Sequence, residues 1–380
     1  MPHMNARSRP TWLGINLVAI GSNVRRLVAL AGVPLLVVLK ADGYGHGALR
    51  VAQIALTHGA AALAVATLDE ARRLRRAGIR APILLLGYTP PWQAPEAVRL
   101  NVTCTIFDRA VAHALSAAAV ALDREVRVHV KVDTGMARLG LPPAAVGTLL
   151  AELSKLPGLR VEGIYTHFAT ADSCDETFAR LQLARFTDLL AELAAHGLRP
   201  PLAHAANSAA LLRFPAARLD MVRPGIACYG LAPSAETPLP AGFQPALSFH
   251  TEIVQIKEVP AGTPISYGGT FVTQRPSRIA TLPVGYADGL RRTPQGQMVL
   301  VHGQRVPVVG RVTMDYTLID VTALPTARCG DAVILIGRQG AAVITADEVA
   351  AWLGTISYEV VATLLPRVPR EIHGEVSEGE

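Results

Sequence analysis

The residue with the clearest chemical potential is Lys40, which ends an apolar run, Leu35 to Leu39, and precedes a glycine-rich loop, residues 41–47. A lysine that closes a buried strand loses part of its hydration, and its neutral amine can then react with an aldehyde. A lone lysine at a strand end more commonly points to water. The other polar groups of the chain therefore decide between these two interpretations.

Further polar groups follow apolar runs in the same way. In a barrel of parallel strands such positions share the carboxyl-terminal rim, where catalytic side chains and phosphate sites occur. Glycine also lets a backbone amide approach a phosphate closely. The pattern predicts one site assembled from distant segments, with these members: Lys40, Lys131, Arg138, His167, Ser208, Arg223, Gly225 and Ile226.

The elements that must position these groups alternate between short apolar runs and helical patterns from about residue 30 to 230. This alternation is typical of an α/β fold, here an N-terminal (β/α)8 TIM-like barrel. The expected helices include 68–77, 143–153 and 175–196. The expected strands are Leu35–Lys40, Ala62–Thr67, Ile83–Gly87, Val102–Phe107, Val126–Val132, Val161–His167, Leu202–Ala206 and Met221–Gly230.

The pattern changes after about residue 245, where turns join strand-like segments and only Ala346–Leu353 is a convincing helix. A C-terminal mostly-β domain is therefore expected over residues 241–380. A polar tail (1–10) precedes the barrel (11–240), whose first strand, about 11–18, could instead pair with the β domain. The expected β-domain strands are Leu247–Val259, Arg278–Val284, Gln297–Val301, Arg305–Val309, Thr317–Val321 and Ala332–Ile336.

Composition narrows the function. The 380 residues are 50% hydrophobic and 17% charged, which favours a folded core, and the net charge of +6 forms no basic stripe for nucleic acid. No apolar stretch approaches the ~20 residues of a membrane helix. The four cysteines are far apart and fit a reducing cytoplasm, and no metal-ligand spacing is present.

Segments along nearly the whole chain resemble the alanine racemases, bacterial enzymes of fold type III that use pyridoxal 5'-phosphate (PLP). The resemblance implies an isomerase that interconverts L-alanine and D-alanine, a cytoplasmic homodimer with shared active sites that supplies D-alanine for peptidoglycan. The matching segments are the Lys40 loop, Lys131–Gly140, His204–Ala210, Arg223–Gly230, Ser266–Gly268, Pro283–Gly289, Gly310–Asp315 and Tyr358 with Glu359.

The same resemblance implies residue roles. Lys40 would bind PLP and act as the base for D-alanine, and Tyr267 of a second subunit would act on L-alanine. The supporting residues would be His167, Lys131, Tyr286 and Asp315, with Lys131 at a position that is carbamylated in some members. Arg138 and the backbone at Met314 would bind the substrate carboxylate. The cofactor-binding set would be Lys40, Tyr44, Ser208, Arg223, Gly225, Ile226 and Tyr358.

Two of these roles have a clear physical basis. Arg223, with a reference pKa of ~12.5 or above, can donate a hydrogen bond to the pyridine nitrogen but does not readily give up its proton. The ring then stays a weak electron sink, which suits a reaction that only moves a proton. Tyr267, with a reference pKa of ~10, is a poor base unless nearby positive charge lowers that value. Alone, a tyrosine in such a turn is more commonly a packing residue.

Alternatives remain at this stage. A decarboxylase of the same fold would need an acidic pyridine partner, against which Arg223 argues. A PLP carrier without catalysis would not need the second domain. A racemase of broader specificity, or one that prefers serine, stays open because Thr313 stands where many family members have serine or cysteine. Gly14 and Asn16 also depart from the family pattern, in a way that affects packing rather than chemistry.

Overall fold

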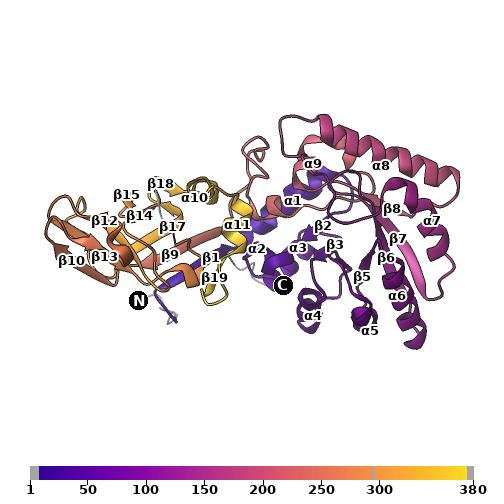
Figure 1. Cartoon of the computed structure of the whole chain (residues 1–380), viewed down its shortest axis with the longest axis horizontal. Coiled ribbons are helices and arrows are strands. Elements are labelled where there is room, and N and C mark those ends of the chain that lie inside the picture. The colour runs from indigo at the N-terminus through magenta and orange to yellow at the C-terminus, as the bar shows by residue number, and fades with distance from the viewer. Residues whose placement is uncertain (1–7, 293–295, 375–380) are drawn as a thin grey trace, which may run out of the picture. The chain divides into compact units, whose positions relative to one another are not determined.

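The computed structural model describes residues 8–292 and 296–374 (Figure 1). The backbone divides into two compact units. The barrel unit spans Ala19–Gln244, and the β unit combines the chain up to Val18 with the chain from Pro245 onward. Residues 1–7 of the predicted polar tail and residues 375–380 of the predicted β domain lie outside the described residues.

The barrel unit is built on parallel strands that pair in chain order, with helices around them (Figure 1). The strands are β2 (Leu36–Val38), β3 (Ala62–Val65), β4 (Ile83–Leu85), β5 (Thr103–Ile106), β6 (Val126–Lys131), β7 (Leu159–Tyr165) and β8 (Leu202–His204). The helices are α1 (Leu17–Ala31), α2 (Lys40–Tyr44), α3 (Ala48–Thr57), α4 (Leu68–Arg76), α5 (Ala94–Arg99), α6 (Arg109–Ala121), α7 (Pro143–Leu153), α8 (Thr177–Ala195) and α9 (Ser208–Arg213), with short 3₁₀ turns η1 (Pro91–Gln93) and η2 (Pro215–Ala217).

The eighth strand that the sequence predicts over Met221–Gly230 is wrong beyond its first two residues. Met221 and Val222 form isolated parallel bridges to β8 and to the residue before β2, which closes the ring of strands. The carbonyl oxygen of Pro224 still accepts from the Val38 N–H (3.0 Å), but Pro224 has no N–H to donate. The chain then leaves the sheet, and Ile226–Tyr229 forms the 3₁₀ helix η3. The irregular segment that replaces the strand carries Arg223 and Gly225.

The helices of the barrel unit cover the strands with apolar stripes. α8 shows the pattern: Phe186, Leu189, Leu190 and Leu193 are buried at helical spacing, while Ala184, Arg185 and Asp188 are exposed. The strands themselves are apolar on both sides, since one side faces the barrel interior and the other faces the helices. Polar side chains in the interior are therefore exceptions that need partners.

The β unit consists mainly of antiparallel strands. One sheet has the order β15-β14-β17-β9-β1-β19, with β18 on β17, and the others are β10-β13-β16 and β11-β12. The strands are β1 (Thr11–Asn16), β9 (Leu247–Glu252), β10 (Gln255–Val259), β11 (Pro264–Ile265), β12 (Phe271–Val272), β13 (Ser277–Leu282), β14 (Met298–Val301), β15 (Gln304–Pro307), β16 (Thr317–Asp320), β17 (Ala332–Gln339), β18 (Ala342–Ile344) and β19 (Arg370–His373). The helices are α10 (Ala346–Leu353) and α11 (Ser357–Ala362), with the 3₁₀ turns η4 (Tyr267–Gly269) and η5 (Tyr286–Asp288).

Two sequence-based expectations for this unit are wrong. The single strand predicted over Leu247–Val259 is two strands, because the chain passes at Ile253 and Val254 from one sheet to another. The helix α11 was not expected beside α10; its six residues are too short to show a helical period. α11 carries Tyr358, which the sequence analysis predicts as a cofactor-binding residue.

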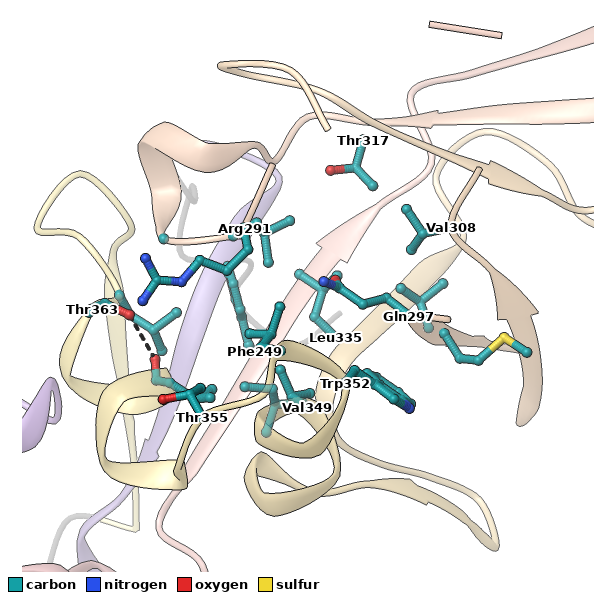
Figure 2. Close-up of a pocket in the computed structure, with 18 residues that line it drawn as sticks. Phe249, Arg291, Gln297, Val308, Thr317, Leu335, Val349, Trp352, Thr355 and Thr363 are labelled. Atoms are coloured by element: carbon teal, nitrogen blue, oxygen red, sulfur yellow. Dashed lines mark hydrogen bonds between the residues drawn. The ribbon is translucent and has the colours of Figure 1, made fainter. Parts of the chain in front are cut away.

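An apolar pocket lies in the β unit, and its lining includes Val349 and Trp352 of α10 with Phe249 and Leu335 of the sheet (Figure 2). It adjoins a buried cluster of Leu300, Ile334 and Ile344. In the described part of the chain, none of the residues that line this pocket is a predicted site residue. We interpret it as a gap in the packing of the core.

Candidate active site

The sequence predicts that Lys40 ends the first barrel strand. In the structure β2 stops at Val38, so Lys40 lies two residues beyond it. The next element, α2, is a left-handed turn in which Ala41, Asp42 and Gly43 have φ of 54°, 53° and 64°. Burial lowers the pKa of Lys40, and the charge of Arg138 lowers it further, while the charge of Glu70 opposes both. A lowered pKa raises the fraction of neutral amine, which is the nucleophilic form.

The hydroxyls of Ser208 and Tyr44 lie close to the backbone N–H groups at the start of η3. The Ser208 hydroxyl accepts hydrogen bonds from the N–H groups of Gly225 (3.0 Å) and Ala227 (3.3 Å) at the start of η3, where Ile226 lies between them. A methyl group at Gly225 would come within 2.5 Å of the Tyr44 hydroxyl oxygen, so only glycine fits there. Hydroxyls and backbone amides of this kind are the donors that bind a phosphate group. The arrangement fits a phosphate-bearing ligand.

Arg223 lies in the barrel interior and is 3% exposed. Its guanidinium donates to the carbonyl oxygens of Thr166 (2.7 Å) and Ala205 (3.0 Å), and to the Nδ1 atoms of His204 (2.8 Å) and His167 (3.3 Å). Burial lowers the pKa of Arg223 to about 10, so it remains charged at neutral pH. Four acceptors among the described residues leave at least one of its five N–H groups for a further acceptor.

The contact with Arg223 fixes the tautomers of two buried histidines. Because arginine only donates, His204 Nδ1 must accept, and its proton must be on Nε2. His204 Nε2 is 2.8 Å from His129 Nδ1, so His129 accepts there and carries its own proton on Nε2, 3.4 Å from Glu162. Burial lowers the pKa of both histidines, and the charge of Arg223 lowers it further, although Glu162 partly opposes the shift at His129. Directed hydrogen bonds thus run from Arg223 through His204 to His129, whose Nε2 lies near the Glu162 carboxylate.

Tyr165 forms a platform beneath the two interior cations. Its ring is stacked on His204, with 4.7 Å between ring centroids, and lies 4.5 Å from Lys131 Nζ and 5.0 Å from the Arg223 guanidinium carbon. Cations above an aromatic face are stabilised by the ring. Burial nevertheless lowers the pKa of Lys131 well below its usual value, and the charges of Arg223 and Arg138 add to this effect.

The loop that carries Arg138 is held by its own aspartate. Asp133 Oδ1 accepts from the N–H groups of Gly135 (2.9 Å), Met136 (2.9 Å) and Ala137 (3.1 Å). Burial would raise the pKa of Asp133, but these bonds keep it below its usual value. Arg138 itself is exposed. It is free to bind an anionic group at the rim.

His167 lies between the interior and the rim. Burial lowers its pKa well below the usual value, and the charges of Arg223, Lys131, Arg138 and Lys40 lower it further. His167 is therefore neutral at neutral pH and can accept a hydrogen bond from Arg223. The barrel unit thus brings together Lys40, Tyr44, Lys131, Arg138, His167, Ser208, Arg223, Gly225 and Ile226.

In the β unit, Tyr267 lies in η4 and is 68% exposed. The preceding Ser266 has a φ of 60° and donates its hydroxyl to the carbonyl oxygen of Arg311 (2.6 Å). A methyl group at Gly310 would lie 2.7 Å from the carbonyl oxygen of Ile265, so the turn packs closely on this glycine. The phenol is therefore presented to solvent from a constrained turn.

The segment with Met314 and Asp315 is anchored by a buried carboxylate. Arg367 donates to Asp315 (2.8 Å) and to Asp288 (2.8 Å), which is fully buried. Tyr286, at 38% exposure, and Met314, at 53%, lie on adjoining turns, joined by a bond from the Tyr286 N–H to the Thr313 carbonyl oxygen (3.0 Å). Tyr358 is carried separately by α11.

Comparison with known proteins decides the family. Residues 15–233 match the family model "Alanine racemase, N-terminal domain" and residues 246–372 match "Alanine racemase, C-terminal domain". The chain is 48% identical over 371 residues to an alanine racemase of Symbiobacterium thermophilum, covering 97% of this chain and 98% of the relative.

The chain belongs to the alanine racemase family.

Further relatives and solved structures agree. An alanine racemase of Desulfosudis oleivorans is 49% identical over 373 residues, covering 94% of this chain and 95% of the relative. The crystal structure of an alanine racemase from Bacillus anthracis with bound L-Ala-P has a TM-score of 0.91 and 43% identity, covering 97% of this chain and 96% of that one. The predictions of the family, of an isomerase and of a barrel with a mostly-β domain are confirmed.

The sequence motifs did not identify several residues that lie near the predicted site residues. Tyr165, His129 and Glu162 do not belong to the predicted set. Tyr165 nevertheless contacts Arg223, and His129 and Glu162 lie beyond His204 in the series that starts at Arg223. A signal was present in Gly163, where a methyl group would lie 2.8 Å from the His129 ring. Strand pairing then sets Tyr165 beside both Lys131 and His204.

The neutral histidines predict a pH-dependent stability. Their pKa is below 6.5 in the folded chain but near ~6.5 when unfolded, so both states are neutral above that pH. As the pH falls below 6.5, the unfolded chain binds protons that the folded chain cannot, and stability is lost. Each histidine contributes about 1.4 kcal/mol per pH unit until its folded pKa is reached.

We therefore expect the free energy of unfolding, measured with urea, to fall between pH 7.5 and 5.5, and His129→Gln to lessen this fall by about 1 kcal/mol. The exposed His113 supplies the control, because His113→Gln should retain the wild-type fall. Equal pH dependence in all three proteins would contradict the assignment of a neutral His129.

Proposed function

We propose that this chain interconverts L-alanine and D-alanine with PLP as its cofactor. The observation that carries the proposal is the pairing of a half-buried amine of lowered pKa, Lys40, with a buried guanidinium, Arg223, whose donors are not all occupied. A PLP enzyme needs an amine for the aldehyde and a partner for the pyridine nitrogen. The relatives named alanine racemase support the substrate.

The donor set supports PLP as the ligand. Lys40 would hold its aldehyde carbon, and Arg223 would donate to its ring nitrogen. When bound, PLP makes the Cα proton of an amino acid acidic by withdrawing electrons. Because Arg223 keeps its own proton, this withdrawal stays moderate, which favours proton transfer over decarboxylation. The phosphate would lie among Tyr44, Ser208, Gly225, Ile226 and Tyr358.

Two side chains would move the Cα proton. We propose that Lys40 removes it from D-alanine and that Tyr267 removes it from L-alanine. In each direction the other of the two groups then donates a proton to the opposite face. The β unit would supply Tyr267 to the site of a second copy in a homodimer. The 68% exposure of Tyr267 in the single chain supports this role, because a catalytic phenol needs a covered site.

Substrate selection would involve both units. Arg138 would bind the carboxylate through paired donors, together with the backbone at Met314, while Tyr286 and Asp315 would line the entrance. His167 would support Arg223. Carbamylation of Lys131 would add a negative charge near Arg138, and the lowered pKa of Lys131 supports it because only a neutral amine reacts with carbon dioxide.

A broader specificity, or a preference for serine, is the second candidate. The residue that suggests this broader specificity is Thr313. Its hydroxyl both donates to the Tyr316 carbonyl oxygen and accepts from the Tyr316 N–H, each at 3.0 Å, so it closes its own turn. This engagement favours alanine over a hydroxylated substrate.

The product would be used in the cytoplasm as D-alanine for peptidoglycan. The four cysteines support this location, since Cys104, Cys174, Cys228 and Cys329 are all free thiols. Among the described residues, no helix has the length and apolar character needed to cross a bilayer. No group of metal-ligating side chains occurs in the same residues.

The first prediction for this function is racemisation itself. With PLP, optical rotation should decay to zero from either L-alanine or D-alanine, and more slowly from L-serine. Lys40→Ala should lower the rate by at least about 10³-fold, because it removes a catalytic base and the cofactor anchor. Lys155→Ala on the protein surface is the control. Retained activity in Lys40→Ala would overturn the site.

The second prediction concerns the shared site. Lys40→Ala and Tyr267→Phe should each be inactive alone, but a mixture that has exchanged subunits should regain up to about a quarter of wild-type activity per site, since half of the dimers are mixed and each has one intact site. Tyr316→Phe, also exposed in the β unit, should remain active. No recovery in verified heterodimers would mean that Tyr267 acts within its own chain.

A further inference from the structure

The two carboxylate oxygens of Glu70 accept hydrogen bonds from two different segments of the chain. It is the third residue of α4, where its Oε2 accepts from the N–H groups of Ala66 (2.8 Å) and Thr67 (3.0 Å), and the Thr67 hydroxyl accepts from the Glu70 N–H (3.3 Å). This reciprocal pair is a capping box. The second oxygen, Oε1, does not serve the helix. It accepts a hydrogen bond of 2.6 Å from the N–H of Ala41.

Ala41 begins the turn that follows Lys40, and this turn is strained. Ala41, Asp42 and Tyr44 have positive φ values of 54°, 53° and 53° although none is glycine. A left-handed backbone costs about 1–2 kcal/mol for each such residue. Four consecutive residues in this conformation persist only when the surrounding structure holds them.

The turn is held at both ends by carboxylates. Within it, the N–H of Gly43 donates to the Leu39 carbonyl oxygen (2.7 Å) and the N–H of Gly45 to the Ala41 carbonyl oxygen (2.9 Å). At its far side, Asp42 Oδ1 accepts from the Ala48 N–H at the start of α3 (2.9 Å). At its near side, next to Lys40, the hydrogen bond from the Ala41 N–H to Glu70 Oε1 holds the turn in the same way.

The position of this hydrogen bond matters for Lys40 and Tyr44 together. The turn separates the two residues and sets their side chains 6.0 Å apart, measured from the lysine Nζ to the centre of the tyrosine ring. It also places the Tyr44 hydroxyl against Gly225. In addition, the charge of Glu70 raises the pKa of Lys40, against the effects of burial and of Arg138.

We propose that Glu70 is a positioning residue for Lys40, holding the amide of Ala41 so that the left-handed turn fixes the direction of the lysine side chain. The inference rests on the proposed function, in which Lys40 moves the Cα proton. A capping residue alone needs only the bonds to Ala66 and Thr67, and the bond to Ala41 adds nothing to the helix.

The test compares Glu70→Ala and Glu70→Gln with two matched variants. Thr67→Ala removes the other half of the capping box but leaves the bond to Ala41. Asp69→Ala removes the same charge from the adjacent residue of the same helix. Thermal unfolding first establishes that each variant folds, and Glu70→Gln supplies the folded variant if Glu70→Ala does not.

The first readout is amide hydrogen exchange at Ala41 in the enzyme loaded with PLP. A hydrogen bond to a charged acceptor contributes about 1.5–3 kcal/mol, so its loss should speed exchange at Ala41 by about tenfold or more in the Glu70 variants. Exchange there should stay near the wild-type rate in Thr67→Ala and Asp69→Ala. Unchanged exchange in both Glu70 variants would overturn the proposal.

The second readout is the α-deuterium isotope effect in each direction. If only the Lys40 step slows, the effect should rise with deuterated D-alanine, where Lys40 removes the deuteron. It should fall toward one with deuterated L-alanine, where Tyr267 removes it. The rate should fall about tenfold or more in Glu70→Ala. Equal changes in both directions, or the same pattern in Thr67→Ala, would overturn the proposal in favour of a general folding role.

These readouts separate two kinds of failure. If wild-type protein does not racemise alanine, the proposed function fails, while exchange at Ala41 still reports whether Glu70 holds the turn. If wild-type protein is active but the Glu70 variants show neither faster exchange nor opposite isotope effects, the function survives and this inference alone is wrong.

Discussion

The interaction on which the rest of the site depends is the burial of the Arg223 guanidinium inside the barrel. A buried charge is costly unless it is paired or fully hydrogen-bonded. Here the direct partners are two carbonyl oxygens and two histidines rather than a carboxylate. The positive charge is therefore dispersed and not neutralised, and every titratable neighbour has to adapt to it.

That adaptation explains the unusual state of the surrounding groups. His167 and His204 stay neutral because burial and Arg223 both oppose a second positive charge. Lys131 shares the Tyr165 platform with Arg223 and has a strongly lowered pKa for the same two reasons. Glu162, the carboxylate beside the far end of this series, is separated from Arg223 by His204 and His129. A site with this balance favours neutral amines and welcomes anionic ligands, which are the properties that a PLP enzyme for amino acids requires.

The sequence predicted the barrel, seven of its strands and the placement of Lys40 and Ser208 after strands, because apolar runs and the residues that follow them are local features. It missed what depends on pairing between strands. The series through His204 and His129 needs the register of β6, β7 and β8, and the hydrogen bond between Ala41 and Glu70 joins residues whose partnership no local pattern encodes. The left-handed turn over residues 41–44 could not be predicted from the sequence either, since alanine, aspartate and tyrosine do not favour that backbone conformation. The eighth strand failed because Pro224 ends a run that otherwise looks extended.

In the proposed function, Arg223 would keep its proton and only donate a hydrogen bond to the ring nitrogen of PLP. The most direct measurement is the ¹⁵N chemical shift of the ring nitrogen in protein reconstituted with ¹⁵N-labelled PLP, at neutral pH and beside the free cofactor titrated across its own pKa. The account predicts the shift of an unprotonated, hydrogen-bonded pyridine, and a shift toward a free, unbonded ring in Arg223→Ala. The shift of a pyridinium in the unmodified protein would contradict it.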